Sequence, residues 1–150
     1  MTSVGSEPVV VRPRRLTQVA WAVAVVTVVA FAIVGYALTR SPGEMQFGPV
    51  DQALMTGTGV LLAAAALLFT RARVVAGADG IRVRNAFGEK QLPWGVVAAV
   101  RFDASSSWAT LELQDDDELA LLAVQAADGD SAAEAVRALR ALLDASRAGA

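Results

Sequence analysis

The sequence predicts an α+β membrane protein, in which a two-helix transmembrane hairpin precedes a small antiparallel β-barrel or sandwich capped by a C-terminal α-helix. Two long apolar runs fill the first half of the chain, short alternating segments separated by turn residues follow, and apolar residues recur at helical spacing near the end. The composition agrees, because 55% hydrophobic and 19% charged residues are typical of a small membrane protein rather than of a soluble domain.

The first apolar run, residues 16–38, contains no charged side chain. A helix rises about 1.5 Å per residue, so about 20 residues cross a hydrocarbon layer of roughly 30 Å. Arg12, Arg14 and Arg15 stand directly before the run, and basic residues beside a spanning helix are retained in the cytoplasm. We therefore expect the N-terminus to be cytoplasmic, with residues 1–15 forming a disordered tail.

A signal peptide is the alternative interpretation of this segment. Basic residues before an apolar core also describe secretion signals, and Arg14-Arg15 resembles a twin-arginine start. However, the run is longer than the usual signal core of about 7–15 residues, and no good Ala-x-Ala site follows it. Cleavage would make the chain a secreted, antigen-like protein.

The second apolar run, residues 53–69, spans roughly 26 Å as a helix, which is marginal but sufficient for a membrane crossing. Arg71 and Arg73 close it and again favour the cytoplasmic side. Residues 16–70 are thus predicted to form a hairpin with a short external loop at 39–52. The expected location is the plasma (inner) membrane, crossed twice, with both termini in the cytoplasm.

Small residues in the second run indicate close helix packing. Gly59 and Ala63 have the small-x-x-x-small spacing, and Gly57 lies near them. Packing within the hairpin is the favoured interpretation because such patterns are common in spanning helices. The alternative is a face that assembles with other membrane proteins, which would make the chain a structural subunit of a membrane complex.

The composition also excludes several functions. Residues 71–150 contain nine Lys/Arg and twelve Asp/Glu, and without a strongly basic domain nucleic acid is not an expected partner. The chain has no Cys and no His, which removes thiolate and imidazole metal sites, Cys nucleophiles and His-based triads. We expect neither an enzyme nor a cofactor.

Residues 71–150 are predicted to form a domain of short antiparallel strands followed by a helix. The turn at 77–80 is tight, and the regular spacing favours a small sheet or a partly open barrel. Ser131 and Glu134 have the spacing of a capping box at the start of the helix. The expected strands are 73–76, 81–84, 90–92, 96–102, 108–113 and 118–124.

Three segments of this domain have a characteristic sequence: Ala-Asp-Gly-Ile-Arg-Val-Arg-Asn at 78–85, Leu-Pro-Trp at 92–94 and Val-Ala-Ala-Val-Arg-Phe at 97–102. In this order they resemble the bacterial pleckstrin-homology-like (PH-like) domains, of the type carried behind two membrane helices in low-molecular-weight protein antigen 6. The resemblance implies a seven-stranded, two-sheet barrel closed at one end by the C-terminal helix, with no known enzymatic activity. The residues expected to anchor the fold are Pro93, Trp94, Val136, Leu139 and Leu143.

Four arginines are the candidate contacts for phosphate or anionic lipid. Arg82 and Arg84 alternate with apolar residues and share a strand face, Arg73 can join them across the hairpin, and Arg71 stands nearby in sequence. A solvated strand face is the alternative, because the turn at 77–80 contains an acid and no Lys. The acidic run at 115–118 is too compact for a calcium loop, so we expect no metal site.

These observations favour a membrane-anchored PH-like protein that acts as a non-catalytic binding or scaffolding module. Its expected partners are the lipid bilayer and a membrane-associated protein, met on a sheet edge or beside the C-terminal helix. Tethering would raise the effective concentration of the domain for such partners.

Overall fold

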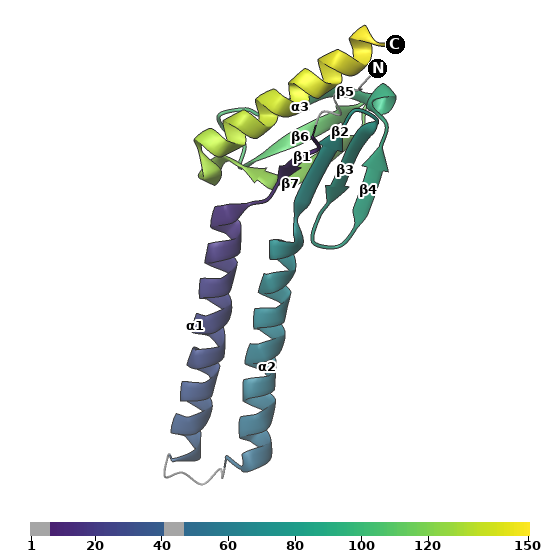
Figure 1. The fold of residues 1–150 in the computed structure, drawn as a ribbon. Helices are drawn as coiled ribbons and strands as arrows, with labels where there is room; N and C mark the ends of the chain where they lie inside the picture. Colours follow the sequence, from purple (N-terminus) through teal and green to yellow (C-terminus); the bar gives the residue numbers. More distant parts are fainter. Residues whose placement is uncertain (1–6, 41–46) are drawn as a thin grey trace. The chain divides into compact units, whose positions relative to one another are not determined.

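The structure is a computed structural model that describes residues 7–40 and 47–150 (Figure 1). The chain divides into two compact units. One comprises residues 16–70, and the other combines the chain up to Arg15 with Arg71–Ala150. The helical unit is therefore an insertion within the sequence of the second unit.

The helical unit contains α1 (Arg14–Thr39) and α2 (Pro49–Leu68), and the 3₁₀ turn η1 (Phe69–Arg71) follows. Both predicted helices are confirmed, and each begins earlier than its apolar run. Helix α2 starts at Pro49 because proline suits the first helical position, where no amide donor is needed. The Asp51 carboxylate accepts the Gly48 N–H at 2.9 Å and completes this start.

The second unit contains seven strands in two antiparallel sheets (Figure 1). The first sheet has the order β1-β2-β3-β4, and the second has the order β5-β6-β7. All six strands predicted after Arg71 are present, with small shifts at their ends. The bounds are β1 Val9–Val11, β2 Arg73–Gly77, β3 Gly80–Arg84, β4 Glu89–Leu92, β5 Val97–Arg101, β6 Trp108–Leu113 and β7 Glu118–Gln125.

The two sheets do not join into a closed barrel over the described residues, so the barrel form of the prediction is wrong. Between β4 and β5 the chain passes through Pro93 and the 3₁₀ helix η2 (Trp94–Val96). Proline has no amide donor and cannot continue a ladder. The arrangement is two small sheets with a helix packed on them.

Strand β1 lies in the segment for which the sequence predicts a disordered tail. Val9–Val11 pairs with β2 in the register Val9↔Ala76 to Val11↔Val74. Three successive β-branched residues suit an edge strand, and Val9 and Val11 pack against the core. The prediction differs here because so short a strand has no readable period, and its partner lies far away in sequence.

The turn between β2 and β3 is as tight as predicted. Gly77 pairs with Gly80, so Ala78 and Asp79 form a two-residue loop. A Cβ on Gly80 would collide with the carbonyl oxygen of Leu92 in β4. Glycine is therefore required for the close approach of these strands.

Helix α3 (Asp130–Ala148) covers the sheets with one apolar face. It begins after Gly129, which has a φ of 57°, and the Ser131 hydroxyl donates to the Asp128 carbonyl oxygen at 2.9 Å. The predicted capping box is thus wrong, because the helix starts before Ser131. The face turned to the core consists of Ala132, Ala135, Val136, Leu139 and Leu143.

The core of this unit is entirely apolar among the described residues. Ile81, Leu111, Leu121 and Leu139 are its largest fully buried side chains. Each carries roughly 1.5–3 kcal/mol of burial free energy. The core of this unit is thus formed mainly by residues of the two sheets and α3.

Candidate functional site

Three of the four candidate arginines lie on one face of the first sheet. Arg73 pairs with Arg84 across β2 and β3, and Arg82 pairs with Val75. The neighbouring positions Val74 and Val83 point the other way and are buried. The strand alternation predicted from the sequence therefore brings these guanidinium groups together on the outer face.

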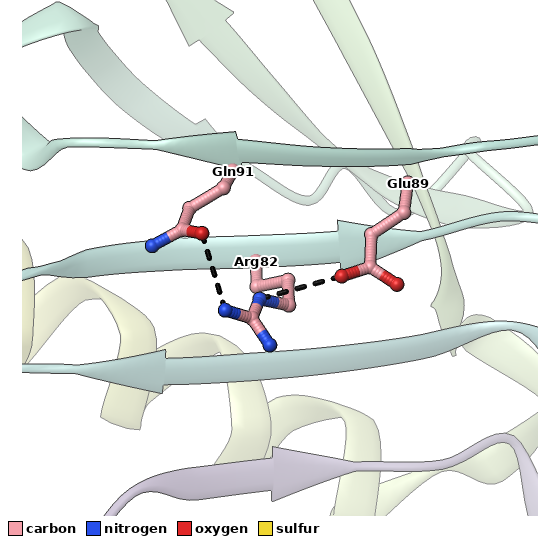
Figure 2. Close-up of polar contacts among 3 residues, drawn as sticks. All are labelled: Arg82, Glu89 and Gln91. Carbon is pink, nitrogen blue, oxygen red and sulfur yellow. Dashed lines mark hydrogen bonds and ion pairs between the residues drawn. The ribbon is translucent and has the colours of Figure 1, made fainter.

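Arg82 is engaged by side chains of β4 (Figure 2). Its Nη2 donates to Gln91 Oε1 at 3.1 Å, and its Nε lies 3.4 Å from Glu89 Oε1. Exposed pairs of this kind contribute at most about 1 kcal/mol. Nevertheless, they hold the guanidinium along the sheet and compensate its charge, so Arg82 is not the best candidate for an external anion.

Arg84 and Arg71 flank a cavity of about 290 Å³ at the turn between β3 and β4. The turn residues Asn85–Gly88 form most of the wall, and Glu89 completes it. Ligand cavities in proteins are typically about 300–1,000 Å³, so this one suits a small group. Within the described chain, neither arginine has an ion-pair partner within 4.0 Å.

The turn that forms this cavity is held by Asn85. Its backbone N–H donates to the Gly88 carbonyl oxygen at 2.8 Å, and its side-chain Nδ2 donates to the Ala120 carbonyl oxygen at 3.1 Å. Phe87, at the tip, is 86% exposed. The sequence indicates a turn here through Asn85 and Gly88, but not that Arg71 lies against it, since that contact is tertiary.

The expected fold anchors divide into buried and exposed positions. Trp94 is buried, and its indole Nε1 donates to the Gly77 carbonyl oxygen at 2.8 Å. Val136, Leu139 and Leu143 are buried on α3. Pro93 is exposed and precedes η2. Trp94 thus ties the turn between β2 and β3 to the segment that links the sheets.

The small residues of α2 do not all lie on the same face of the helix. A Cβ on Gly59 would lie 2.8 Å from Phe31 Cβ on α1, whereas a Cβ on Gly57 would meet nothing within 4 Å. Ala63 is buried with Gly59. Gly59 and Ala63 therefore lie on the buried face of α2, and Gly57 lies apart from it.

The acidic run from Asp115 to Glu118 covers the end of the turn between β6 and β7 and the first residue of β7, and all four residues are exposed. Asp116 has a φ of 64°, a conformation that Asp and Asn tolerate better than most residues. No cluster of three or more potential metal-ligating side chains is found in the part of the chain that the structure describes.

A larger cavity, of about 550 Å³, lies between β1 and α3. Its apolar lining comes from Val9–Val11 on one side and from Ala132 and Ala135 on the other. Arg14 and Glu134 add charges to its wall. The sequence predicts a contact surface beside the C-terminal helix. It does not predict that Val9–Val11 forms one wall of this groove, because β1 is not predicted as a strand.

Comparison with known proteins identifies the second unit. Residues 71–142 match the family model described as "Bacterial PH domain". The chain is also 37% identical over 135 residues to Uncharacterized protein Rv1417 of Mycobacterium tuberculosis (strain H37Rv) and to Uncharacterized protein Mb1452 of Mycobacterium bovis. Each alignment covers 90% of this chain and 88% of the relative.

No solved structure gives a significant match. PH-like domains are generally non-catalytic binding modules, and no enzyme family is indicated. The matched segment begins at Arg71 and contains β2 to β7 with most of α3. From the extent and identity of these matches, the chain belongs to the family of these mycobacterial proteins and carries a bacterial PH domain.

Proposed function

We propose that this chain is a membrane-anchored, non-catalytic binding module. In this proposal α1 and α2 cross the plasma (inner) membrane, both termini lie in the cytoplasm, and the PH domain binds a membrane-associated protein. The observation that carries it is the insertion of two exposed apolar helices between two paired strands of the domain.

The exposed apolar side chains of α1 and α2 support their insertion into a lipid bilayer. Only 17% of the most apolar stretch of α1 and 11% of that of α2 is buried, whereas a core helix of a soluble protein is mostly buried. Leu61 on α2 is 72% exposed. Apolar surface on this scale is costly in water and favourable in a bilayer.

The strand pairing supports a double crossing. The chain leaves the first sheet after Val11 and re-enters it at Arg73, and Val11 pairs with Val74. Both ends of the inserted hairpin are thus attached to neighbouring positions of one sheet. If α1 carries the chain across a membrane, α2 must bring it back.

The charges beside the helices support the orientation. Arg12, Arg14 and Arg15 precede or open α1, and Arg71 and Arg73 follow α2. Under the positive-inside rule this side is the cytoplasm. The PH domain is then held at the inner leaflet, where tethering raises its effective concentration for membrane-associated partners.

The groove between β1 and α3 is our candidate contact for the protein partner. It combines an apolar floor with flanking charges and lies beside the edge strand β1. Edge strands and grooves beside helices are recurring sites of peptide recognition. The rival structural-subunit function is disfavoured because Gly59 faces Phe31 of the same hairpin.

Labelling of single cysteines tests the topology, since the chain has no native Cys. We expect a membrane-impermeant maleimide to label Gln46→Cys in intact cells and to label Ala150→Cys only after lysis. Labelling of Ala150→Cys in intact cells would overturn the proposal.

The signal-peptide alternative has a separate test. Cleavage after the first apolar segment would remove Val9–Val11 and leave the β2 edge without its partner strand. N-terminal sequencing of the membrane-bound protein should give a start at Met1 or Thr2. A start beyond α1 would support secretion instead.

A further inference from the structure

We infer that the free edge of β1 accepts a short extended segment of the partner protein as an added strand, with an acidic residue of that segment beside Arg12 and Arg14. The inference deepens the proposed function and rests on it, because it names the form and the charge of what the groove between β1 and α3 binds. Backbone groups of β1 supply the hydrogen bonds, and the groove holds side chains of the added strand.

Four strands lie at the edges of the two sheets, namely β1, β4, β5 and β7. An edge strand presents backbone N–H and C=O groups that no neighbouring strand pairs, and proteins usually cover or charge such edges. Strand β4 carries Glu89, Lys90 and Gln91, all of them exposed. Its charged side chains therefore disfavour pairing with another chain.

Side chains occupy backbone acceptors of β5 and β7. Arg140 on α3 donates from its Nε to the Val100 carbonyl oxygen at 3.0 Å, and Arg147 on α3 donates to the Ala98 carbonyl oxygen. The Asn85 side chain donates to the Ala120 carbonyl oxygen of β7 at 3.1 Å. A strand added to β5 or β7 would have to compete with these donors.

The edge of β1 has no such cover. Val9–Val11 pairs with β2 alone, and an antiparallel neighbour uses the backbone groups of alternate residues only. The remaining N–H and C=O groups point to the free edge, and no side chain of the described residues bonds to them. Val10 is 45% exposed. Because its residues are β-branched, β1 is a favourable edge for strand addition.

The groove beside β1 has room for the side chains of one short strand. Its volume is about 550 Å³, and Ala135 and Ala138 of α3 and Ala123 of β7 give it small apolar walls. Pro8 and Pro13 flank β1, and proline has no N–H with which to continue a ladder. The added strand is therefore limited to the 3 residues of β1, as in a short linear motif.

The charges of the groove favour an acidic segment. Arg12 and Arg14 are exposed and line it, and neither has an ion-pair partner within 4.0 Å among the described residues. The acids in its wall are Asp128 and Glu134, and Asp128 already accepts the Arg15 N–H at 3.1 Å. An acid next to the paired residues compensates the two arginines and sets the register of the added strand.

Selection from a displayed library of random octapeptides tests this edge, with the full chain in phosphatidylcholine nanodiscs as the target. We expect the enriched peptides to combine adjacent β-branched residues with Asp or Glu. The best peptide is then added at ten times its Kd. Hydrogen exchange of the Val9–Val11 amides at the free edge should slow about tenfold, whereas the fragments covering β4 and β5 should not change.

Backbone methylation of the probe distinguishes strand addition from filling of the groove. Methyl groups on the amide nitrogens of its β-branched residues remove hydrogen-bond donors and leave the side chains unchanged. This change should weaken binding about tenfold. Equal binding of the methylated peptide would overturn the inference.

The variant Arg12→Gln/Arg14→Gln tests the charge. It should bind the acidic peptide and the peptide with Gln in place of the acid equally well. Arg71→Gln/Arg84→Gln is the control, because it removes the same charge from the cavity at the turn between β3 and β4 and should keep the preference for the acid. The fragment covering β6 serves as a folding check in both variants.

Other occupants and other edges give different results. A library that yields no enriched peptide, or protection of β4 or β5 in place of β1, would overturn the inference. Protection of β1 that grows with chain concentration, without any peptide, would assign the edge to a second copy instead. The topology experiment is independent, so external labelling of Ala150→Cys refutes the anchoring, whereas an unprotected β1 with internal Ala150 refutes only the added strand.

Discussion

The two units of this chain use similar apolar side chains in opposite ways. In the helical unit Leu61 and Val26 are 72% and 66% exposed, and mainly small residues are buried between the helices. In the PH domain Leu111 of β6 and Leu139 of α3 are fully buried in the core. The domain thus buries its large apolar side chains in a core of its own, whereas the hairpin leaves many of them exposed.

This difference predicts where a substitution is costly. Leu139→Ala should lower the stability of the domain by about 2–5 kcal/mol, because it leaves a cavity in a closely packed core. Leu61→Ala on α2 should change the stability by no more than about 0.5 kcal/mol. The urea midpoint of each full-length variant, followed in detergent by tryptophan fluorescence, measures both. Similar losses of stability in Leu139→Ala and Leu61→Ala would contradict the difference between the two units.

Gly59→Leu is expected to have the next largest effect. A side chain at this position meets Phe31 of α1, and overpacking of this kind costs about 1–3 kcal/mol. Gly57→Leu is the control, because nothing lies within 4 Å of its Cβ position. Disulfide cross-linking of cysteines placed in α1 and α2 should decline for Gly59→Leu alone.

Trp94→Phe should destabilise the domain by about 1–3 kcal/mol, since it leaves the Gly77 carbonyl oxygen without its indole donor. The partly exposed Trp108 offers the comparison, and Trp108→Phe should cost less. Thermal unfolding of the solubilised chain measures the two variants. Equal melting temperatures would show that the indole hydrogen bond contributes nothing.

Arg82→Gln should have the smallest effect, within about 1 kcal/mol, because its contacts with Glu89 and Gln91 are exposed. High salt should reduce the difference between this variant and the natural chain. A larger, salt-independent loss in urea titrations would mean that the contact does more than hold a surface side chain.

Most helices and strands of this fold can be predicted from the sequence, because each shows its own pattern of apolar and polar residues. Residues 16–38 are apolar on every face, and residues 81–84 alternate, so each period can be read without knowing a partner. The strand at Val9–Val11 is not predicted, because it is short and its partner, β2, begins far away in sequence at Arg73. The capping box fails because the turn at Gly129 starts α3 before Ser131.

The candidate site is harder to predict than the fold. Alternation places Arg82 and Arg84 on one face, but it does not distinguish between them. Only the structure pairs Arg82 with Glu89 and brings Arg71 against the turn at Asn85–Gly88. Both contacts join residues that the fold brings together from separate elements, and the periodicity of the sequence does not indicate such contacts.

The pairing of β1 with β2 also sets an order of events during synthesis. Val9–Val11 leaves the ribosome first, but its partner positions Val74–Ala76 emerge only after both helices have been made. Such a contact has a large sequence separation and forms slowly. Completion of the first sheet is therefore coupled to completion of the hairpin, and a chain stalled between α1 and α2 keeps its first strand unpaired.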